Sequence, residues 1–371
     1  MLVARLAVFA VGAVIVQAVL RSAVRTVVVP RGEQPALTRL TFAVVRVPFD
    51  ALARVRGDVE GREQTLARYA PAALLTVVLM WVLGVIAGFV FLFWAADGER
   101  TWSESIYLSG SSITTLGMRA PETPAGFLLA FAEAVIGLGI VALMISYLPT
   151  LYSLYSAREA EVVKLDVRAG SPPTALELFT RMQRVGWLDA LDPMWESWEQ
   201  WFVELEESHT SHPALQFFRS RRLGSNWTTA AGAVLDAAAI ATSVLAIDQS
   251  AQAAITMRAG FLALRSIAQF QGIPVDTDPE PNAPISVHRQ EFDLLLDELT
   301  AIGLPVVEDR EQAWRDFAGW RVNYDRALIG LCALVEAPAA SWSADRIDGW
   351  RRPGVLHKHW VVPALETPPS W

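Results

Sequence analysis

The sequence predicts an all-α membrane protein that continues into a C-terminal α-helical domain outside the membrane. Three apolar stretches in the first 156 residues are long enough to cross a bilayer, which takes about 20 apolar residues. From Ala157 the chain becomes acidic and rich in tryptophan, with helical periodicity and no run of alternating strands. A length of 371 residues and a hydrophobic fraction of 53% fit a chain with both parts.

Composition argues against several classes of function. The single cysteine, Cys332, rules out an internal disulfide and favours a reducing compartment for most of the mass. A formal net charge of −8 disfavours nucleic acid as a partner. We find no phosphate-binding glycine loop, and no nucleophile and base spaced for catalysis. We therefore expect no enzyme, no cofactor and no bound metal.

Residues 1–30 are expected to hold a first transmembrane helix. Leu2 to Leu20 is apolar apart from Arg5 and Gln17, and no small-residue cleavage site follows. We therefore favour an uncleaved helix over a signal peptide. The chain from 21 to 68 carries nine arginines against five acidic residues. By the positive-inside rule this connection is cytoplasmic, which places the N-terminus outside.

Residues 31–68 are expected to form this basic cytoplasmic segment, largely as a helix. Leu40, Val44 and Val47 recur at helical spacing, with arginines among them. One interpretation is a helix that lies in the membrane interface and is attracted by anionic lipid. The other is a linker helix packed on protein. Pro48 is expected to kink or divide the helix.

Residues 69–156 are predicted to form a domain with two spans and a re-entrant loop between them. Pro71 to Ala96 is the second span, in which Gly84 and Gly88 would let another helix approach closely. Thr101-Trp102-Ser103-Glu104 has the form of a capping box and starts a short helix. Pro124 to Tyr155 is the third span. The nine residues Ser111–Arg119 are too short to cross a bilayer, which suits irregular backbone buried at membrane depth.

This loop resembles the selectivity filter of the two-transmembrane potassium-channel superfamily, which reads Thr-Thr-Val-Gly-Tyr-Gly-Asp. The matching residues are Thr114, Thr115, Leu116 and Gly117, whereas Met118 and Arg119 replace the tyrosine and the second glycine. The wider chain is similar to a bacterial family of potassium-channel-like membrane proteins, through residues 145–149, 168–173 and 314–325. The resemblance implies a homotetramer in the cell membrane with monovalent ions in its pore.

Residues Thr114–Arg119 are therefore the candidate filter. In a ring of four chains, the backbone carbonyls of Thr115, Leu116 and Gly117 and the Thr115 hydroxyl would replace the hydration shell of a cation. Four copies of Arg119 at the outer mouth would repel cations unless a carboxylate neutralises them, and the candidates are Glu104, Glu122 and Glu133. Three outcomes stay open: a weakly selective cation pore, an anion pore, or a channel-like protein that does not conduct.

The third span supplies the candidate gate. Gly139 falls where the resembled family has a hinge glycine, although this part of the helix also suits tight packing against the short helix. Pro149 is expected to interrupt the span, and Tyr147, Pro149 and Leu151 mark the candidate inner gate. Glu133 is a carboxylate at membrane depth, where such groups usually face the bundle interior and carry function. We hypothesise that it pairs with Arg119.

Residues 157–371 are expected to form a cytosolic helical domain that binds a protein or ligand. A helix is predicted from Thr174, with helical patterns at about 193–208, 213–222, 227–246, 250–271, 288–302 and 310–335. Residues 228–247 are apolar enough for a fourth span, but Asp236 at their centre favours a buried core helix.

Two clusters in this domain are interpreted as structural. Trp195, Trp198 and Trp201 share one helix face and favour a packed core over a ligand-binding cage. Glu206, His209 and His212 have the spacing of metal ligands, but with no cysteine nearby we favour a structural role.

The leading hypothesis is a homotetrameric ion-conducting pore in the lipid bilayer of the cell membrane, with a cytosolic helical domain that assembles or gates it. The alternative is a non-conducting scaffold or sensor whose helical domain binds a protein partner.

Overall fold

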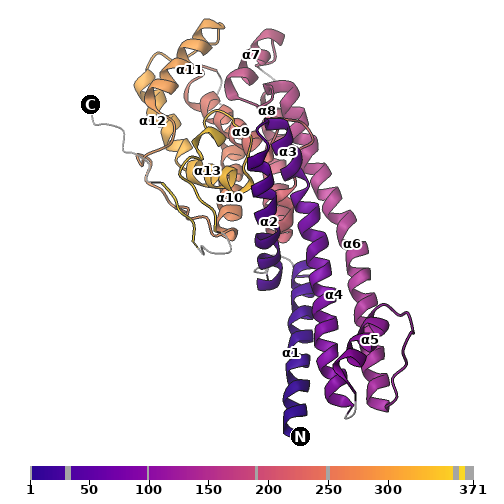
Figure 1. Cartoon of the computed structure of the whole chain (residues 1–371). Helices are drawn as coiled ribbons and strands as arrows, with labels where there is room; N and C mark the ends of the chain where they lie inside the picture. Colours follow the sequence, from indigo (N-terminus) through magenta and orange to yellow (C-terminus); the bar gives the residue numbers. More distant parts are fainter. Residues whose placement is uncertain are drawn as a thin grey trace. The chain divides into compact units, whose positions relative to one another are not determined.

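The computed structural model describes residues 2–29, 35–97, 100–188, 191–247, 251–353 and 359–363. Within them the chain is 74% helical and has no β-strand beyond two isolated bridges, which confirms the all-α prediction. Positions 30–34, where the expected first transmembrane segment meets the expected basic segment, lie outside the described residues. The helices in chain order (Figure 1) are α1 (Leu2–Val27), α2 (Ala36–Val55), α3 (Val59–Ala67), α4 (Tyr69–Ala96), α5 (Trp102–Ile113), α6 (Pro124–Ala169), α7 (Ala175–Val185), α8 (Leu191–Ser211), η2 (Pro213–Phe217), α9 (Trp227–Ser243), α10 (Ala251–Phe270), α11 (Arg289–Ala301), α12 (Arg310–Arg321), α13 (Asp325–Val335) and η3 (Ala344–Arg346).

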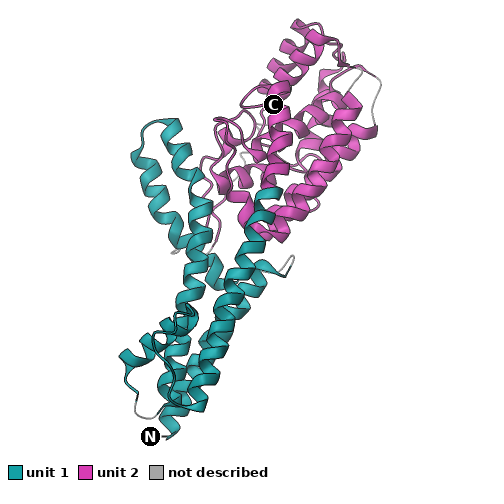
Figure 2. Cartoon of the chain, turned by 90° about the vertical axis from the view of Figure 1, so that its right-hand side faces the viewer, with its two compact units in different colours: residues 1–153 teal, residues 154–371 magenta. Residues whose placement is uncertain are grey.

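Three helical stretches are long and apolar enough to cross a membrane: Leu2–Val27, Val59–Ala96 and Pro124–Ala169. Their number agrees with the three predicted spans. The chain divides into two compact units, residues 1–153 and 154–371, drawn in teal and magenta in Figure 2. The candidate spans belong to the first unit, except for the end of α6, which continues into the second.

Close packing of glycine against valine joins α1 to α4 in unit 1. A Cβ atom on Gly88 would lie 2.5 Å from Val16 Cγ2, and one on Gly84 would lie 2.6 Å from Val19 Cγ2. The predicted close approach at these two glycines is therefore confirmed, because any larger residue would push the helices apart. The Trp81 indole N–H also donates to Ser22 Oγ at 3.2 Å, which adds a polar contact between the two helices.

The basic segment packs on α4 along one side of α2. Tyr69 Oη donates to the Phe42 carbonyl at 3.1 Å, and the Arg46 guanidinium lies over the Tyr69 ring, 4.6 Å from its centroid. The opposite side of α2 exposes apolar residues such as Val44. The helix thus has one protein-packed side and one apolar exposed side. It also runs without a break through Pro48, so division of the helix there is wrong.

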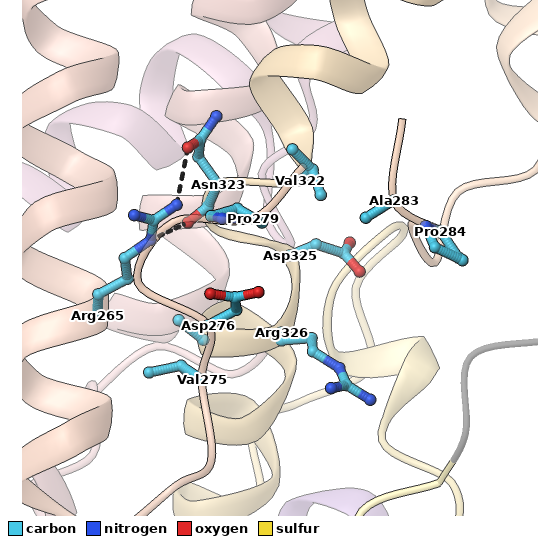
Figure 3. Close-up of a pocket in the computed structure, with 11 residues that line it drawn as sticks. Arg265, Val275, Asp276, Pro279, Ala283, Pro284, Val322, Asn323, Asp325 and Arg326 are labelled. Atoms are coloured by element: carbon cyan, nitrogen blue, oxygen red, sulfur yellow. Dashed lines mark hydrogen bonds between the residues drawn. The ribbon is translucent and has the colours of Figure 1, made fainter. Parts of the chain in front are cut away.

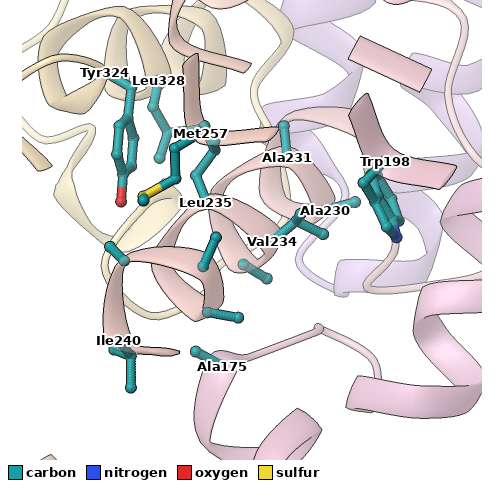
Figure 4. Packing of buried hydrophobic residues seen from close by; sticks show 14 of the residues in the cluster. Ala175, Trp198, Ala230, Ala231, Val234, Leu235, Ile240, Met257, Tyr324 and Leu328 are labelled. Carbon is teal, nitrogen blue, oxygen red and sulfur yellow. The ribbon is translucent and has the colours of Figure 1, made fainter. Parts of the chain in front are cut away.

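Unit 2 is built around α9, which is buried along its whole length and packs against α7, α10, α12 and α13. Figure 4 shows its small side chains, including Ala230 and Val234, packed near Trp198 of α8 and Met257 of α10. The prediction of a buried core helix is confirmed. Trp195, Trp198 and Trp201 are also almost fully buried in this core, as the packed-core interpretation requires.

Two predicted helices of unit 2 are wrong, and tertiary hydrogen bonds explain both. Residues 213–222 form only the short turn η2 instead of a helix, because Arg158 donates to the carbonyls of Leu215 and Phe218 and fixes the chain there. The pattern at 310–335 is split into α12 and α13. At the break, Arg265 donates to both the backbone carbonyl and the side-chain oxygen of Asn323.

Candidate functional site

The short helix α5 begins with the predicted capping box. Thr101 Oγ1 accepts a hydrogen bond from the Glu104 N–H at 3.3 Å, and Glu104 Oε2 accepts from the Thr101 N–H at 2.9 Å. The other oxygen of Glu104, Oε1, lies 2.7 Å from Arg119 Nη2. Because Thr101 and Arg119 both donate to it, the pKa of Glu104 falls to about 2. The Glu104 carboxylate is therefore ionised at neutral pH and offsets the charge of Arg119.

Glu133 does not pair with Arg119, so that hypothesis is wrong within the chain. Its Oε1 instead lies 2.5 Å from Ser109 Oγ, on the buried face of α5. Ser109 Oγ also lies 3.2 Å from the carbonyl oxygen of Ile86 in α4. Glu133 is 0% exposed, and its Oε2 has no hydrogen-bond partner in the described part of the chain. One serine thus links α4, α5 and α6.

The single hydroxyl proton of Ser109 faces two acceptor oxygens, one in α4 and one in α6. The Ser109 hydroxyl donates to Glu133 Oε1 at 2.5 Å and faces the Ile86 carbonyl oxygen at the longer distance of 3.2 Å. The two acceptors therefore share one donor, with Glu133 as the closer partner.

The carboxyl end of α5 closes with a reverse turn. The Leu116 N–H donates to the Ser111 carbonyl at 3.0 Å and the Thr115 N–H to the Ser112 carbonyl at 3.1 Å, which is the Schellman pattern. Thr115 has φ of 56° at the position where this turn usually has glycine. A β-branched residue in the left-handed region costs of order 1–3 kcal/mol. The candidate filter therefore contains one residue with a strained backbone, Thr115.

Gly137 of α6 allows α5 to approach. A Cβ atom there would lie 2.6 Å from the Ile113 carbonyl oxygen. Gly139, the candidate hinge, has no atom within 4 Å of the corresponding position. The tight-packing role therefore belongs to Gly137, and Gly139 is left on an open side of the helix. The Ser111 hydroxyl also accepts a bond from the Arg119 N–H at 3.3 Å, which ties the far end of the loop to α5.

The candidate filter residues between these anchors are exposed. All five residues Thr114–Met118 are exposed, with Leu116 at 66% and Met118 at 80%. Arg119, at the end of the loop, is half-buried. Such exposure of apolar side chains in a fixed loop marks a surface that another chain or a pore can use.

The candidate gate residues lie in different surroundings. Tyr147 and Leu151 are buried, whereas Pro149 is exposed. The helix continues through Pro149, so the expected interruption of the span is wrong. Thr150 Oγ1 donates to the Ser146 carbonyl at 3.1 Å in this turn, and such local bonds help a helix to pass a proline. A gating role of Tyr147, Pro149 and Leu151 stays a prediction.

Sequence reasoning missed the roles of the serines of α5. Ser105 and Ser109 are both fully buried, and Ser111 nearly so. Ser105 and Ser109 are four residues apart in a helix whose other side is apolar, and this spacing places two small polar side chains on one face. The sequence thus contained the signal: two small polar side chains on one face of α5, and the Glu133 carboxylate in the next helix, α6.

The Glu206, His209 and His212 cluster is not a metal site in this structure. His209 is completely buried, with Nδ1 2.9 Å from the Leu205 carbonyl and Nε2 3.2 Å from Arg158 Nη1. Both ring nitrogens are therefore in use. No group of three His, Cys, Asp or Glu side chains with the geometry of a metal site occurs in the described part of the chain.

Chemically, the site offers oxygen ligands and one internally balanced charge pair. Comparison with known proteins adds nothing to this description: the chain matches no protein-family model, and no curated protein or solved structure is significantly similar to it.

Proposed function

We propose that the protein is a channel-like pore of the cell membrane, formed by four copies of the chain. In this proposal α4, α5, the loop Thr114–Arg119 and α6 make one quarter of the pore, as the resemblance to the potassium-channel superfamily implies. The N-terminus lies outside and unit 2 lies in the cytoplasm, because the arginine-rich connection follows α1. The cytosolic unit then assembles or gates the pore.

The observation that carries the proposal is the way α5 is held between two candidate spans. Its 12 residues extend about 18 Å, too short to cross a bilayer. Ser109 bonds to α4 and α6, and the carboxyl end packs on Gly137. Irregular backbone beside such a helix is tolerated at membrane depth when it is buried between subunits or lines water.

The Glu104–Arg119 pair favours a cation as the permeant ion over an anion. If Arg119 were unpaired, four guanidinium groups would surround the outer mouth and repel cations. Within each chain the carboxylate lies 2.7 Å from the guanidinium, so the four pairs are nearly neutral. Met118 and Arg119 still replace the residues that potassium channels use, and the proposal therefore claims a weakly selective cation pore.

The second candidate function is a non-conducting scaffold or sensor. It is favoured by the strained turn at Thr115, because a reverse turn differs from the extended run of carbonyls in a potassium filter. Here the exposed loop would be an assembly surface, and unit 2 would bind a protein partner.

Ion flux in liposomes containing the purified full chain tests the proposal. We expect K⁺ and Na⁺ flux exceeding Cl⁻ flux. Glu104→Gln should reduce cation flux at least tenfold, because it leaves Arg119 unbalanced, and adding Arg119→Gln should restore it. Glu122→Gln removes an exposed carboxylate nearby and serves as the matched control. No flux of any of the three ions would overturn the conducting proposal and leave the scaffold.

Disulfide cross-linking tests the assembly separately. The only native cysteine is Cys332, which is buried, and burial raises the pKa of its thiol to about 12, so it reacts slowly. Met118→Cys should form dimers between subunits on mild oxidation if four loops meet at an axis. Leu79→Cys, exposed on α4, is the control and should stay monomeric. Absence of cross-links at position 118 would contradict the ring of loops.

A further inference from the structure

Unit 2 contains a cavity of about 300 Å³ that none of the preceding roles uses. It lies where the Pro-rich connection between α10 and α11 covers the start of α13. Val275, Pro279 and Val322 form apolar parts of its wall, and Arg265, Asp276 and Arg326 are among its charged residues. Small-ligand sites in proteins are about 300–1,000 Å³, so this cavity suits a molecule of amino-acid size.

Two charged groups of the cavity are already in use. Arg265 donates through Nε, Nη1 and Nη2 to the carbonyls of Asn323 and Thr277 and to Asn323 Oδ1, each at 2.6–2.7 Å. Asp325 accepts from Arg321 Nε at 2.7 Å and from the Ser286 N–H and hydroxyl at 3.0 and 2.6 Å. These groups shape the wall and leave little capacity for a ligand.

Two charged side chains of the cavity, Arg326 and Asp276, remain available to bind a ligand. Arg326 makes no ion pair within 4 Å in the described part of the chain, and its Nε is buried without an acceptor. Asp276 accepts the Asp278 N–H at 3.0 Å through Oδ1 and interacts electrostatically with Arg265, and it makes no other hydrogen bond in the described part of the chain. In Figure 3 the Asp276 carboxylate lies between the Arg265 and Arg326 side chains, which come from opposite sides.

We propose that this cavity binds a small zwitterion of the α-amino-acid class, with its carboxylate on Arg326 and its ammonium group on Asp276. A guanidinium binds a carboxylate through two parallel hydrogen bonds, and a carboxylate accepts readily from an ammonium group. The carboxylates of Asp276 and Asp325 would repel a multiply charged anion such as phosphate. The apolar wall indicates an aliphatic side chain. This inference is independent of ion conduction.

The test uses the full chain in detergent and measures binding by isothermal titration calorimetry. The probes are L-leucine, 3-methylbutylamine, which lacks the carboxylate, 4-methylpentanoate, which lacks the ammonium group, and inorganic phosphate. We expect L-leucine to bind, the two single-charge analogues to bind at least tenfold more weakly, and phosphate not to bind. Equal binding of 4-methylpentanoate would overturn the zwitterion, and no binding of L-leucine would overturn the site.

Variants of residues that line the cavity test whether L-leucine binds there. Arg326→Gln and Asp276→Asn should each weaken L-leucine binding tenfold or more, whereas Arg258→Gln and Asp348→Asn, exposed elsewhere in unit 2, should not. Ala283→Phe keeps both charges and should abolish binding by filling the cavity. Circular dichroism checks that each variant is folded. Unchanged binding in all three cavity variants would overturn the assignment.

Discussion

Helix α9 of unit 2 and the apolar part of α6 in unit 1 (residues 124–153) each carry one acidic residue, and the two units accommodate it differently. In unit 2, Asp236 of α9 accepts from Arg321 Nη1 at 2.5 Å and from Tyr324 Oη at 2.8 Å. In unit 1, Glu133 of α6 accepts from Ser109, and its Oε2 has no partner among the residues that the structure describes. Asp236 is part of a complete structural network, whereas Glu133 retains capacity for another interaction.

The largest effect should come from breaking the network in unit 2. Arg321→Met leaves Asp236 and Asp325 buried without their shared cation, and we expect a loss of about 3–5 kcal/mol in the free energy of unfolding. Urea unfolding of the full chain, followed by tryptophan fluorescence, measures it. Arg258→Met, on the exposed side of α10, is the control. Adding Asp236→Asn and Asp325→Asn should recover part of the loss, and no recovery would contradict the charge explanation.

A smaller effect should follow from crowding the α5–α6 contact beside Glu133. Gly137→Ala places a Cβ atom 2.6 Å from the Ile113 carbonyl oxygen, and overpacking of this kind costs about 1–3 kcal/mol. Gly139→Ala, two residues away, meets no atom within 4 Å and should be neutral or slightly stabilising. Thermal unfolding in detergent and the rate of tryptic cleavage after Arg119 compare the two. Equal cleavage rates would contradict the proposed anchoring of the loop.

The next effect concerns His209, a buried side chain of unit 2 whose two ring nitrogens both have hydrogen-bond partners when the ring is neutral. The Leu205 carbonyl can only accept, so the proton of His209 is on Nδ1, and Nε2 accepts from Arg158. Burial, together with the Arg158 charge, holds the pKa of His209 well below its usual 6.5. The unfolded chain therefore binds the extra proton first, and stability present above pH 6.5 is lost as the pH falls.

The expected slope from His209 alone is up to about 1.4 kcal/mol per pH unit below pH 6. Urea unfolding between pH 7.5 and 5 measures it, with His209→Gln flattening this part of the curve. His359→Gln, at an exposed position, is the control and should leave the slope unchanged. An identical slope in His209→Gln and the native chain would show that other groups cause the pH dependence.

The smallest effect should come from Glu133→Gln. A glutamine side chain keeps an oxygen that can accept from the Ser109 hydroxyl, so we expect a change below about 1 kcal/mol in thermal unfolding. Asp236→Asn, its counterpart in unit 2, should cost more because it weakens the pairing with Arg321. If Glu133→Gln proved the more damaging of the two, Glu133 would be ionised and paired with a cation from a neighbouring subunit.

Local pattern was sufficient to predict features that depend on nearby residues. The capping box at Thr101 and Glu104, the close approach at Gly84 and Gly88, and the burial of α9 all follow from spacing within one or two helical turns. Asp236 in an apolar run correctly favoured a protein core, since it is costly in a bilayer and pairs readily inside a protein. The all-α class followed from the same periodicity.

Features that depend on distant partners were not predictable in this way. Arg321 is 85 residues from Asp236, so nothing in the sequence selects it as the partner. Three carboxylates were equally available to Arg119, and only the fold places Glu104 beside it. The break between α12 and α13 depends on Arg265, which lies on another helix. Proline usually interrupts a helix, but α6 continues through Pro149.

The glycine contacts between α1 and α4 have a mechanical consequence. Helices that touch through backbone and valine methyl groups at Gly84 and Gly88 cannot rotate or slide without collision, so we expect the pair to behave as one stiff support. In α6, by contrast, Gly139 is unobstructed, and Pro149 has no N–H to bond to the preceding turn. We therefore expect α6, which continues into the second unit, to bend more readily than the α1–α4 pair.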